Sequence, residues 1–143
     1  TRYIRDWSSD VALPISIQNL EIETIDKKTK SVNTLFDSGS FYSIIKQECL
    51  PVSEYIISYP DPEIFGTASE GGTLEITGSV ELIVTINSKK IKETIFIAPK
   101  LSKEMIIGSK TMQSWHITID NSNGKTTISV DKDMNDPDIT SVV

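Results

Sequence analysis

The sequence feature that most constrains the fold is a long alternation of apolar and polar residues between positions 74 and 86. Successive side chains of a β-strand point to opposite faces of a sheet, so a period of two predicts a strand with one buried face. Gly78 interrupts the middle of this segment and predicts a bend or bulge. A chain that contains such a segment is expected to fold around a β-sheet. The apolar series is Leu74, Ile76, Val80, Leu82, Val84 and Ile86.

Hairpins are predicted on both sides of this strand. A polar turn at residues 87–90 leads into a second alternating segment, which ends before Pro99. Earlier in the chain, the apolar series of residues 13–25 returns through a charged turn into residues 32–36. Near the other end, Asn123-Gly124 is the strongest hairpin signal, because both residues tolerate positive φ.

Helical signals are short and occur in two places, residues 40–50 and residues 109–114. The two halves of the chain also share one order of elements: strand, charged turn, strand, apolar run, glycine. The apolar runs are Leu35-Phe36, which leads into Asp37-Ser38-Gly39, and residues 105–107, which lead into Gly108. This order indicates a weak internal repeat. We therefore predict an all-β fold with one or two short helices.

Composition excludes several classes of protein. The chain has 143 residues, one cysteine (Cys49), one histidine (His116) and a formal net charge of −6. A single cysteine cannot form an internal disulfide, and one cysteine with one histidine cannot build a Cys/His zinc cluster. The acidic balance argues against nucleic acid or an anionic membrane surface as the main partner. We expect no metal site and no cofactor.

The length suits one domain. Residues 1–12 are predicted to be an N-terminal extension, residues 13–131 the folded domain and residues 132–143 a flexible C-terminal tail. The apolar stretches fall far short of the ~18 residues that a transmembrane helix needs. There is no signal-type leader and no glycosylation sequon. These absences favour a cytoplasmic location but leave the compartment open, and the start at Thr1 suggests an origin in a longer polyprotein or multidomain chain.

Asp37 is the residue best placed to carry chemistry. An apolar strand delivers it directly into Ser38-Gly39-Ser40. A carboxylate at the mouth of a buried strand is desolvated, and small residues after it let backbone amides approach its oxygens. Asp-Ser-Gly is also an ordinary turn sequence. The tripeptide alone therefore does not decide between a turn and an active-site carboxylate.

The wider context of Asp37 resembles a known family. Residues 35–40 followed by Ser43-Ile44-Ile45 resemble the active-site loop of retropepsin-like aspartic peptidases. Residues 105–108 resemble the family's second motif, an aliphatic pair before a glycine that packs beneath the catalytic loop. Residues 115–128 look like the strand and hairpin that follow. The resemblance spans about residues 13–130 in the family's order.

The resemblance implies a closed, mostly antiparallel, barrel-like acid-protease fold with a glycine-rich flap hairpin. It implies that Asp37 is the catalytic residue. Ser38, Gly39 and Ser40 would support the active-site loop, and Ile106, Ile107 and Gly108 would pack beneath it. The flap, which would bind substrate, falls on Phe65, Gly66, Thr67, Ala68, Ser69, Glu70, Gly71 and Gly72.

The family's reaction needs two carboxylates, one acting as base on a water molecule and the other as acid. The chain contains a single Asp-Ser-Gly. The resemblance therefore implies a homodimeric aspartic endopeptidase with one Asp37 from each chain, which acts on a peptide or polyprotein substrate. No contact with nucleic acid or membrane is expected.

One departure from the family pattern keeps alternatives open. Retroviral enzymes usually have arginine directly after the second motif, where it braces the dimer, and Ser109 stands there instead. A catalytically weak or inactive module that kept the fold for dimerisation or peptide binding is therefore an alternative. An unrelated small β domain, in which Asp37 is only a turn residue, is another.

Overall fold

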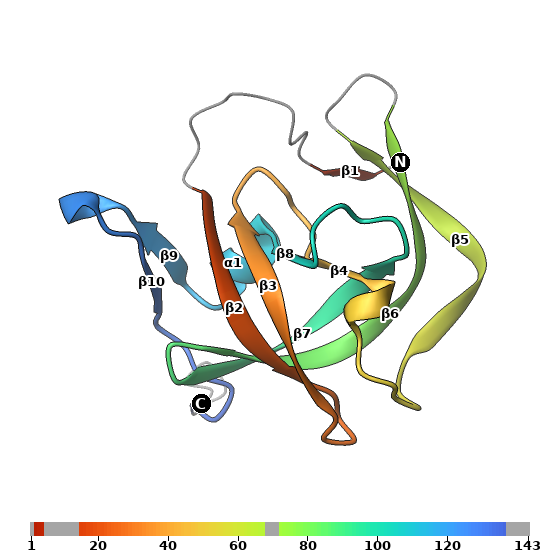
Figure 1. Cartoon of the computed structure of the whole chain (residues 1–143), viewed down its shortest axis with the longest axis horizontal. Helices are drawn as coiled ribbons and strands as arrows, with labels where there is room; N and C mark the ends of the chain where they lie inside the picture. Colours follow the sequence, from red (N-terminus) through yellow and green to blue (C-terminus); the bar gives the residue numbers. More distant parts are fainter. Residues whose placement is uncertain (1, 5–14, 68–71, 137–143) are drawn as a thin grey trace, which may run out of the picture.

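Strands close into a ring at the centre of the molecule (Figure 1). The computed structural model describes residues 2–4, 15–67 and 72–136. The main sheet has the strand order β1-β5-β6-β2-β3-β8-β4-β7, and β7 also pairs with β6, which closes a ring of six strands. This is the closed, mostly antiparallel all-β fold that was predicted. The sheet consists of β1 (Arg2–Ile4), β2 (Ile15–Glu23), β3 (Thr29–Asp37), β4 (Ile44–Lys46), β5 (Ile57–Thr67), β6 (Thr73–Ile86), β7 (Lys89–Ala98) and β8 (Met105–Ile107).

The first predicted hairpin is formed by β2 and β3, which pair antiparallel from Ile15↔Asp37 to Glu23↔Thr29. Its turn is fastened to the loop before β5, because the hydroxyls of Thr24 and Ser53 both donate to the Asp26 carboxylate, at 2.6 and 2.7 Å. These hydrogen bonds hold the pKa of Asp26 below its ordinary value. Because the pairing begins at Asp37 and ends at Glu23↔Thr29, this turn lies at the end of the hairpin opposite Asp37.

The long alternating segment is β6, and it forms the predicted hairpin with β7. Asn87 and Ser88 join the two strands with φ of 49° and 68°, the positive values of a type I′ turn. Gly78 marks an irregularity, as predicted: the pairing of β5 with β6 shifts register between Ser58 and Glu63. A Cβ at Gly78 would clash with the carbonyl oxygen of Ile57. Glycine is therefore needed for the close approach of the two backbones.

The helix prediction for residues 109–114 is confirmed by α1 (Ser109–Ser114). The prediction for residues 40–50 is correct only for its end, where η1 (Gln47–Cys49) is one 3₁₀ turn. Residues 44–46 form β4 instead, because they pair with β7 on one side and β8 on the other. In the described part of the chain, no helix has the length and apolarity to cross a membrane.

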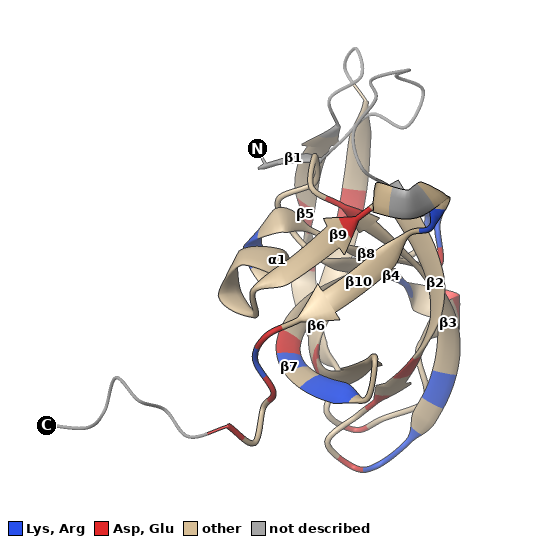
Figure 2. Ribbon diagram, turned by 90° about the vertical axis from the view of Figure 1, so that its left-hand side faces the viewer, with Lys and Arg blue, Asp and Glu red and all other residues tan. Residues whose placement is uncertain are grey.

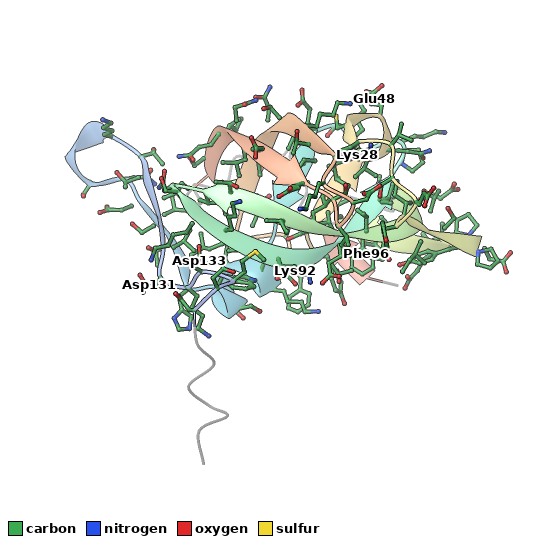
Figure 3. All side chains as sticks on the ribbon, turned by 90° about the horizontal axis from the view of Figure 1, so that it is seen from below. Lys28, Glu48, Lys92, Phe96, Asp131 and Asp133 are labelled. Atoms are coloured by element: carbon green, nitrogen blue, oxygen red, sulfur yellow. The ribbon has the colours of Figure 1, made fainter. Side chains whose placement is uncertain are left out.

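A second, two-stranded sheet follows α1. It is made of β9 (Ile117–Asp120) and β10 (Thr127–Val130), joined through η2 (Ser122–Gly124), and it confirms the hairpin predicted at Asn123-Gly124. After β10 the chain turns back to β7, where the Lys90 N–H donates to the Asp133 carboxylate at 2.7 Å. Figure 3 shows this segment, with Asp131 and Asp133 labelled, beside the β6–β7 hairpin. The proposed limits of the domain, its N-terminal extension and its tail remain predictions.

Two apolar clusters pack on opposite faces of the ring strands. The larger contains Phe36, Ile107 and Ile117, and the smaller contains Leu35 and Ile106. Neighbouring residues of β3 and β8 therefore enter different clusters, and these strands are buried on both faces. A strand buried on both faces needs a continuous apolar run rather than an alternation. This explains the apolar runs before Asp37 and Gly108.

Candidate active site

The structure places Asp37 at the end of a strand that is held on both sides. Strand β3 pairs with β2 at Ile15↔Asp37 and, in parallel, with β8 at Phe36↔Ile107. The Asp37 side chain is fully buried, whereas Ser38 and Gly39 after it are exposed. The carboxylate therefore sits where a buried strand opens to the surface, as its sequence context predicts.

The loop after Asp37 folds back on the carboxylate. The Gly39 N–H donates to Asp37 Oδ1 at 2.9 Å, and the Ser40 N–H donates to the Asp37 carbonyl oxygen at 3.1 Å. The Ser40 side chain is fully buried, and its hydroxyl donates to the Tyr42 carbonyl oxygen at 3.0 Å. These bonds fix the direction in which the carboxylate points. They use the small residues that the sequence places there.

The second motif lies directly beneath this loop. Ile106 and Ile107 are fully buried in β8, and Gly108 follows them. A Cβ on Gly108 would come within 2.5–2.7 Å of the carbonyl oxygens of Ser40, Phe41 and Tyr42. Real Cβ atoms do not approach backbone oxygens so closely, so only glycine lets the loop cross here. The structure thus brings together Asp37, its loop and the residues predicted to pack beneath it.

Main-chain hydrogen bonds join the loop to the start of α1. The Ser109 N–H donates to the Ser40 carbonyl oxygen at 2.6 Å, and the Lys110 N–H donates to the Phe41 carbonyl oxygen at 3.1 Å. The first N–H groups of a helix have no partner within the helix. The loop after Asp37 provides acceptors for two of these donors, which anchors it to α1.

A buried pair of hydroxyls adds a further anchor that sequence reasoning missed. The Ser43 and Thr111 hydroxyl oxygens are 2.6 Å apart, and the Gly108 N–H donates to the Ser43 hydroxyl oxygen at 3.0 Å. The exposed fractions of these side chains are only 4% for Ser43 and 2% for Thr111. Because 68 positions separate Ser43 from Thr111, no local pattern in the sequence could reveal the pair.

Aromatic rings connect the loop to the strand that leads into the predicted flap. Phe41 is half exposed and packs edge-on against Tyr42, with ring centroids 4.8 Å apart. Tyr42 in turn contacts Phe65 of β5 at 5.2 Å and Phe96 of β7 at 5.4 Å. The end of β5 therefore lies beside the loop that follows Asp37.

The predicted flap falls on the end of β5 and the start of β6. Phe65 and Gly66 are buried, Thr67 ends β5, and Gly72 precedes β6. The antiparallel pairs Phe65↔Leu74 and Gly66↔Thr73 make this part a hairpin. Ala68, Ser69, Glu70 and Gly71 lie outside the described residues. Figure 1 shows this hairpin at the same end of the molecule as the end of β3.

A groove of about 440 Å³ opens next to the exposed Ser38. Its walls come from α1 and β9, and Figure 2, which faces this side, shows few charged residues on them. The single histidine, His116, is exposed at this groove. The lining residues are Ser38, Ser109, Met112, Gln113, His116, Ile117 and Ile119.

No group of three or more His, Cys, Asp or Glu side chains within the described ranges is arranged to hold a metal ion. The single cysteine lies outside the site. Cys49 is half-buried in η1, and burial, followed by the nearby Glu104 and Glu48 carboxylates, raises the pKa of its thiol. Asp37 is the acidic side chain of the loop.

Comparisons with known proteins identify the family and the fold. The sequence model of the Ty3 transposon peptidase family matches residues 7–135. The retroviral protease-like domain of Ddi1 from Leishmania major is similar in structure, with a TM-score of 0.58 and 17% identity over 82% of this chain and 90% of that chain. EIAV protease complexed with the inhibitor HBY-793 gives a TM-score of 0.51 and 17% identity over 74% of this chain and 91% of that chain. No curated protein sequence gives a significant match.

Replacing Ser43 by alanine is expected to lower the free energy of unfolding by about 1–3 kcal/mol, since it leaves the buried Gly108 N–H and Thr111 hydroxyl without their partner. Chemical denaturation measures this change. Ser114→Ala is the matched control, because it removes an exposed hydroxyl that donates to Lys110 O in α1, and it should change stability by less than about 0.5 kcal/mol. Equal effects of the two substitutions would show that the hydroxyl pair does not anchor the loop.

Proposed function

Because the chain belongs to the Ty3 transposon peptidase family, we propose that it is an aspartic endopeptidase that acts as a homodimer, with one Asp37 from each chain. The family and the retropepsin fold are those of aspartic proteases. The dimer, the pair of aspartates and the activity are the proposed part.

One observation carries the proposal. Strands β3 and β8 pair in parallel at Leu35↔Ile106 and Phe36↔Ile107, so the next positions in this register are Asp37 and Gly108. The first half of the repeat thus supplies a carboxylate where the second half supplies a glycine. Hydrolysis by a pair of carboxylates needs a second Asp37, and a second copy of the chain supplies it.

The reaction then follows from the pair of carboxyl groups. Two carboxylates close together share a proton, because both cannot easily be ionised at once. The ionised group accepts a proton from a water molecule, whose oxygen attacks the carbonyl carbon of the scissile peptide bond. The protonated group donates to the carbonyl oxygen. A proton then passes to the amide nitrogen as the peptide bond breaks, and activity is expected to favour acid pH.

The loop residues have distinct roles in this proposal. The Gly39 N–H orients the Asp37 carboxylate through Oδ1. Ser38 is exposed next to the groove, where its hydroxyl can bond across the two-fold axis to the partner loop. The β5–β6 hairpin would close over an extended peptide and pair with its backbone as an added strand.

The groove between α1 and β9 is the proposed dimer contact. It is adjacent to Ser38, so a second copy seated there brings two Asp37 loops toward one axis. Strand β9 pairs with β10 along one edge, and among the described residues no strand pairs with its other edge. An apolar groove beside an open strand edge suits a partner that buries both.

A peptide-binding or dimerisation module without useful catalysis is the second candidate. Ser109 stands where retroviral enzymes have the bracing arginine, and this observation favours it. Such a module would form the same dimer and show no turnover on a broad peptide library between about pH 4 and 7.

We expect Asp37→Asn to abolish cleavage of a peptide library at every pH, because an amide cannot accept the proton of the attacking water. Mass spectrometry of the products measures the loss. Asp131→Asn, which changes an exposed carboxylate after β10, is the matched control and should cleave like the wild type. Cleavage that survives in the Asp37→Asn protein would exclude this mechanism.

Mixing tests whether the two aspartates come from two chains. When wild type and Asp37→Asn protein are mixed in equal amounts and allowed to exchange partners, about one quarter of the dimers hold two intact aspartates. Activity per total protein should fall to about that fraction. A fall to one half, as simple dilution gives, would show that each chain carries a complete site.

Ile119→Glu is expected to weaken the dimer by at least about tenfold, since it places a charge in the proposed contact. Sedimentation equilibrium measures the dissociation constant. Thr118→Glu is the matched control: Thr118 is the exposed neighbour of Ile119 in β9 and points to the opposite face. If both proteins stay dimeric while their melting curves match the wild type, the groove is not the contact.

A further inference from the structure

The outer edge of β5 already holds a strand from the same chain. Strand β1 pairs with β5 in parallel at Arg2↔Phe65, Tyr3↔Gly66 and Ile4↔Thr67. The same residues of β5 pair along their other edge with β6, at Phe65↔Leu74 and Gly66↔Thr73. In both Figure 1 and Figure 2, β1 lies against the flap end of β5. Both edges of the strand leading into the flap are therefore occupied.

From this pairing, we infer that the outer edge of β5 at Phe65–Thr67 is a strand-addition site for an extended peptide, and that the chain's own segment Arg2–Ile4 occupies it as an autoinhibitory strand. The inference rests on the proposed peptidase function. That function requires a peptide backbone to pair with the flap. A substrate and β1 cannot form the same main-chain hydrogen bonds at once, so they compete.

The position of this edge relative to Asp37 supports the competition. Phe65 is the first β5 residue opposite β1, and its ring lies 5.2 Å from that of Tyr42 in the catalytic loop. Tyr42 follows Asp37 by five positions in a loop that α1 holds in place. A strand added at Phe65–Thr67 therefore runs beside the carboxylate's loop, where a scissile peptide must pass.

The pairing is suited to displacement. Strand β1 has three residues, so it forms few hydrogen bonds with β5. Residues 5–14 join it to β2, and a tethered segment of this kind has a high effective concentration at its own site without needing strong contacts. A competitor of this type raises the apparent KM of a substrate and leaves kcat unchanged, because saturating substrate displaces it.

Proline substitutions test the inference without removing any part of the chain. Successive N–H groups of a strand point to opposite sides, so of Tyr3 and Ile4 only one N–H faces β5. Proline has no N–H. One of Tyr3→Pro and Ile4→Pro should therefore disrupt the pairing more strongly, whereas Tyr3→Ala and Ile4→Ala keep the N–H and serve as matched controls.

The first measurement uses a peptide that the wild type cleaves. The more disruptive proline variant should have a KM several-fold lower than its alanine control, with the same kcat. An unchanged KM in both proline variants would overturn the inference. A loss of kcat in both, with an unchanged melting temperature, would also overturn it, because β1 would then be part of the working site.

The second measurement does not depend on catalysis, so it separates failure of this inference from failure of the proposed function. Hydrogen exchange should be faster at the amides of Phe65–Thr67 in the proline variant than in its alanine control. A synthetic peptide of residues 1–12 of this chain, added in trans, should restore the protection. Equal exchange in the two proteins would overturn the inference even if the protein is a peptidase. Protection that the peptide restores at Thr73–Thr77 rather than Phe65–Thr67 would also overturn it, since β6 would then provide the binding edge.

Discussion

The parallel pairing of β3 with β8 is the constraint on which the rest of the structure depends. It joins residues 34–36 to residues 105–107, and Phe36, Ile106 and Ile107 are fully buried there. Parallel strands cannot be joined by a tight turn, and here residues 38–104 form the connection between β3 and β8. That intervening chain supplies the β6–β7 hairpin and closes the ring. The pairing also sets Asp37 beside Gly108, which makes room for the loop that carries the carboxylate.

The structure also shows how the loop is braced without the arginine of retroviral enzymes. Ser109 and Lys110 use their backbone N–H groups to hold the carbonyl oxygens of Ser40 and Phe41. A backbone donor does not depend on the side chain at its position. Together with the Ser43–Thr111 hydroxyl pair, these bonds fix the loop within one chain. The absence of arginine at position 109 therefore leaves the geometry of this loop intact, and its consequence would fall on contacts between chains.

The sequence could predict elements whose signal is local. Period-two alternation identified β6 and β7, and the residues after Gly108 identified α1. Residues 44–46 were assigned to a helical turn because their strand partners, Phe96 and Ile106, are distant in the sequence. Strand β5 contains Pro60 and Pro62, which hide its period, and β1 is too short to have one.

The candidate site also has a part that the sequence could predict and a part that it could not. The carboxylate and the small residues around it are contiguous, so Asp37, Gly39 and Ser40 could be recognised from a motif. The contacts that hold them are not contiguous. Thr111, Phe65 and Phe96 reach the loop from three different elements, and only the fold brings them there. A motif can reveal residues that are contiguous in the sequence, whereas contacts between distant elements depend on topology.

Ring closure determines where a partner can pair with the backbone. Six strands of the main sheet pair with one another around the ring, which reduces the number of strand edges open to a partner. Strand β5 extends beyond the ring and β9 belongs to a separate sheet, so each has an edge outside this closed system. Phe65 of β5 contacts Tyr42 in the loop after Asp37, and β9 lines the groove next to Ser38 of the same loop, so both strands lie beside this loop. The edge of β5 is paired with β1, whereas among the described residues no strand pairs with the second edge of β9. In the function and the inference proposed above, an extended peptide pairs with the edge of β5 and a second copy of the chain covers the edge of β9, so peptide binding and dimerisation would not compete for one surface.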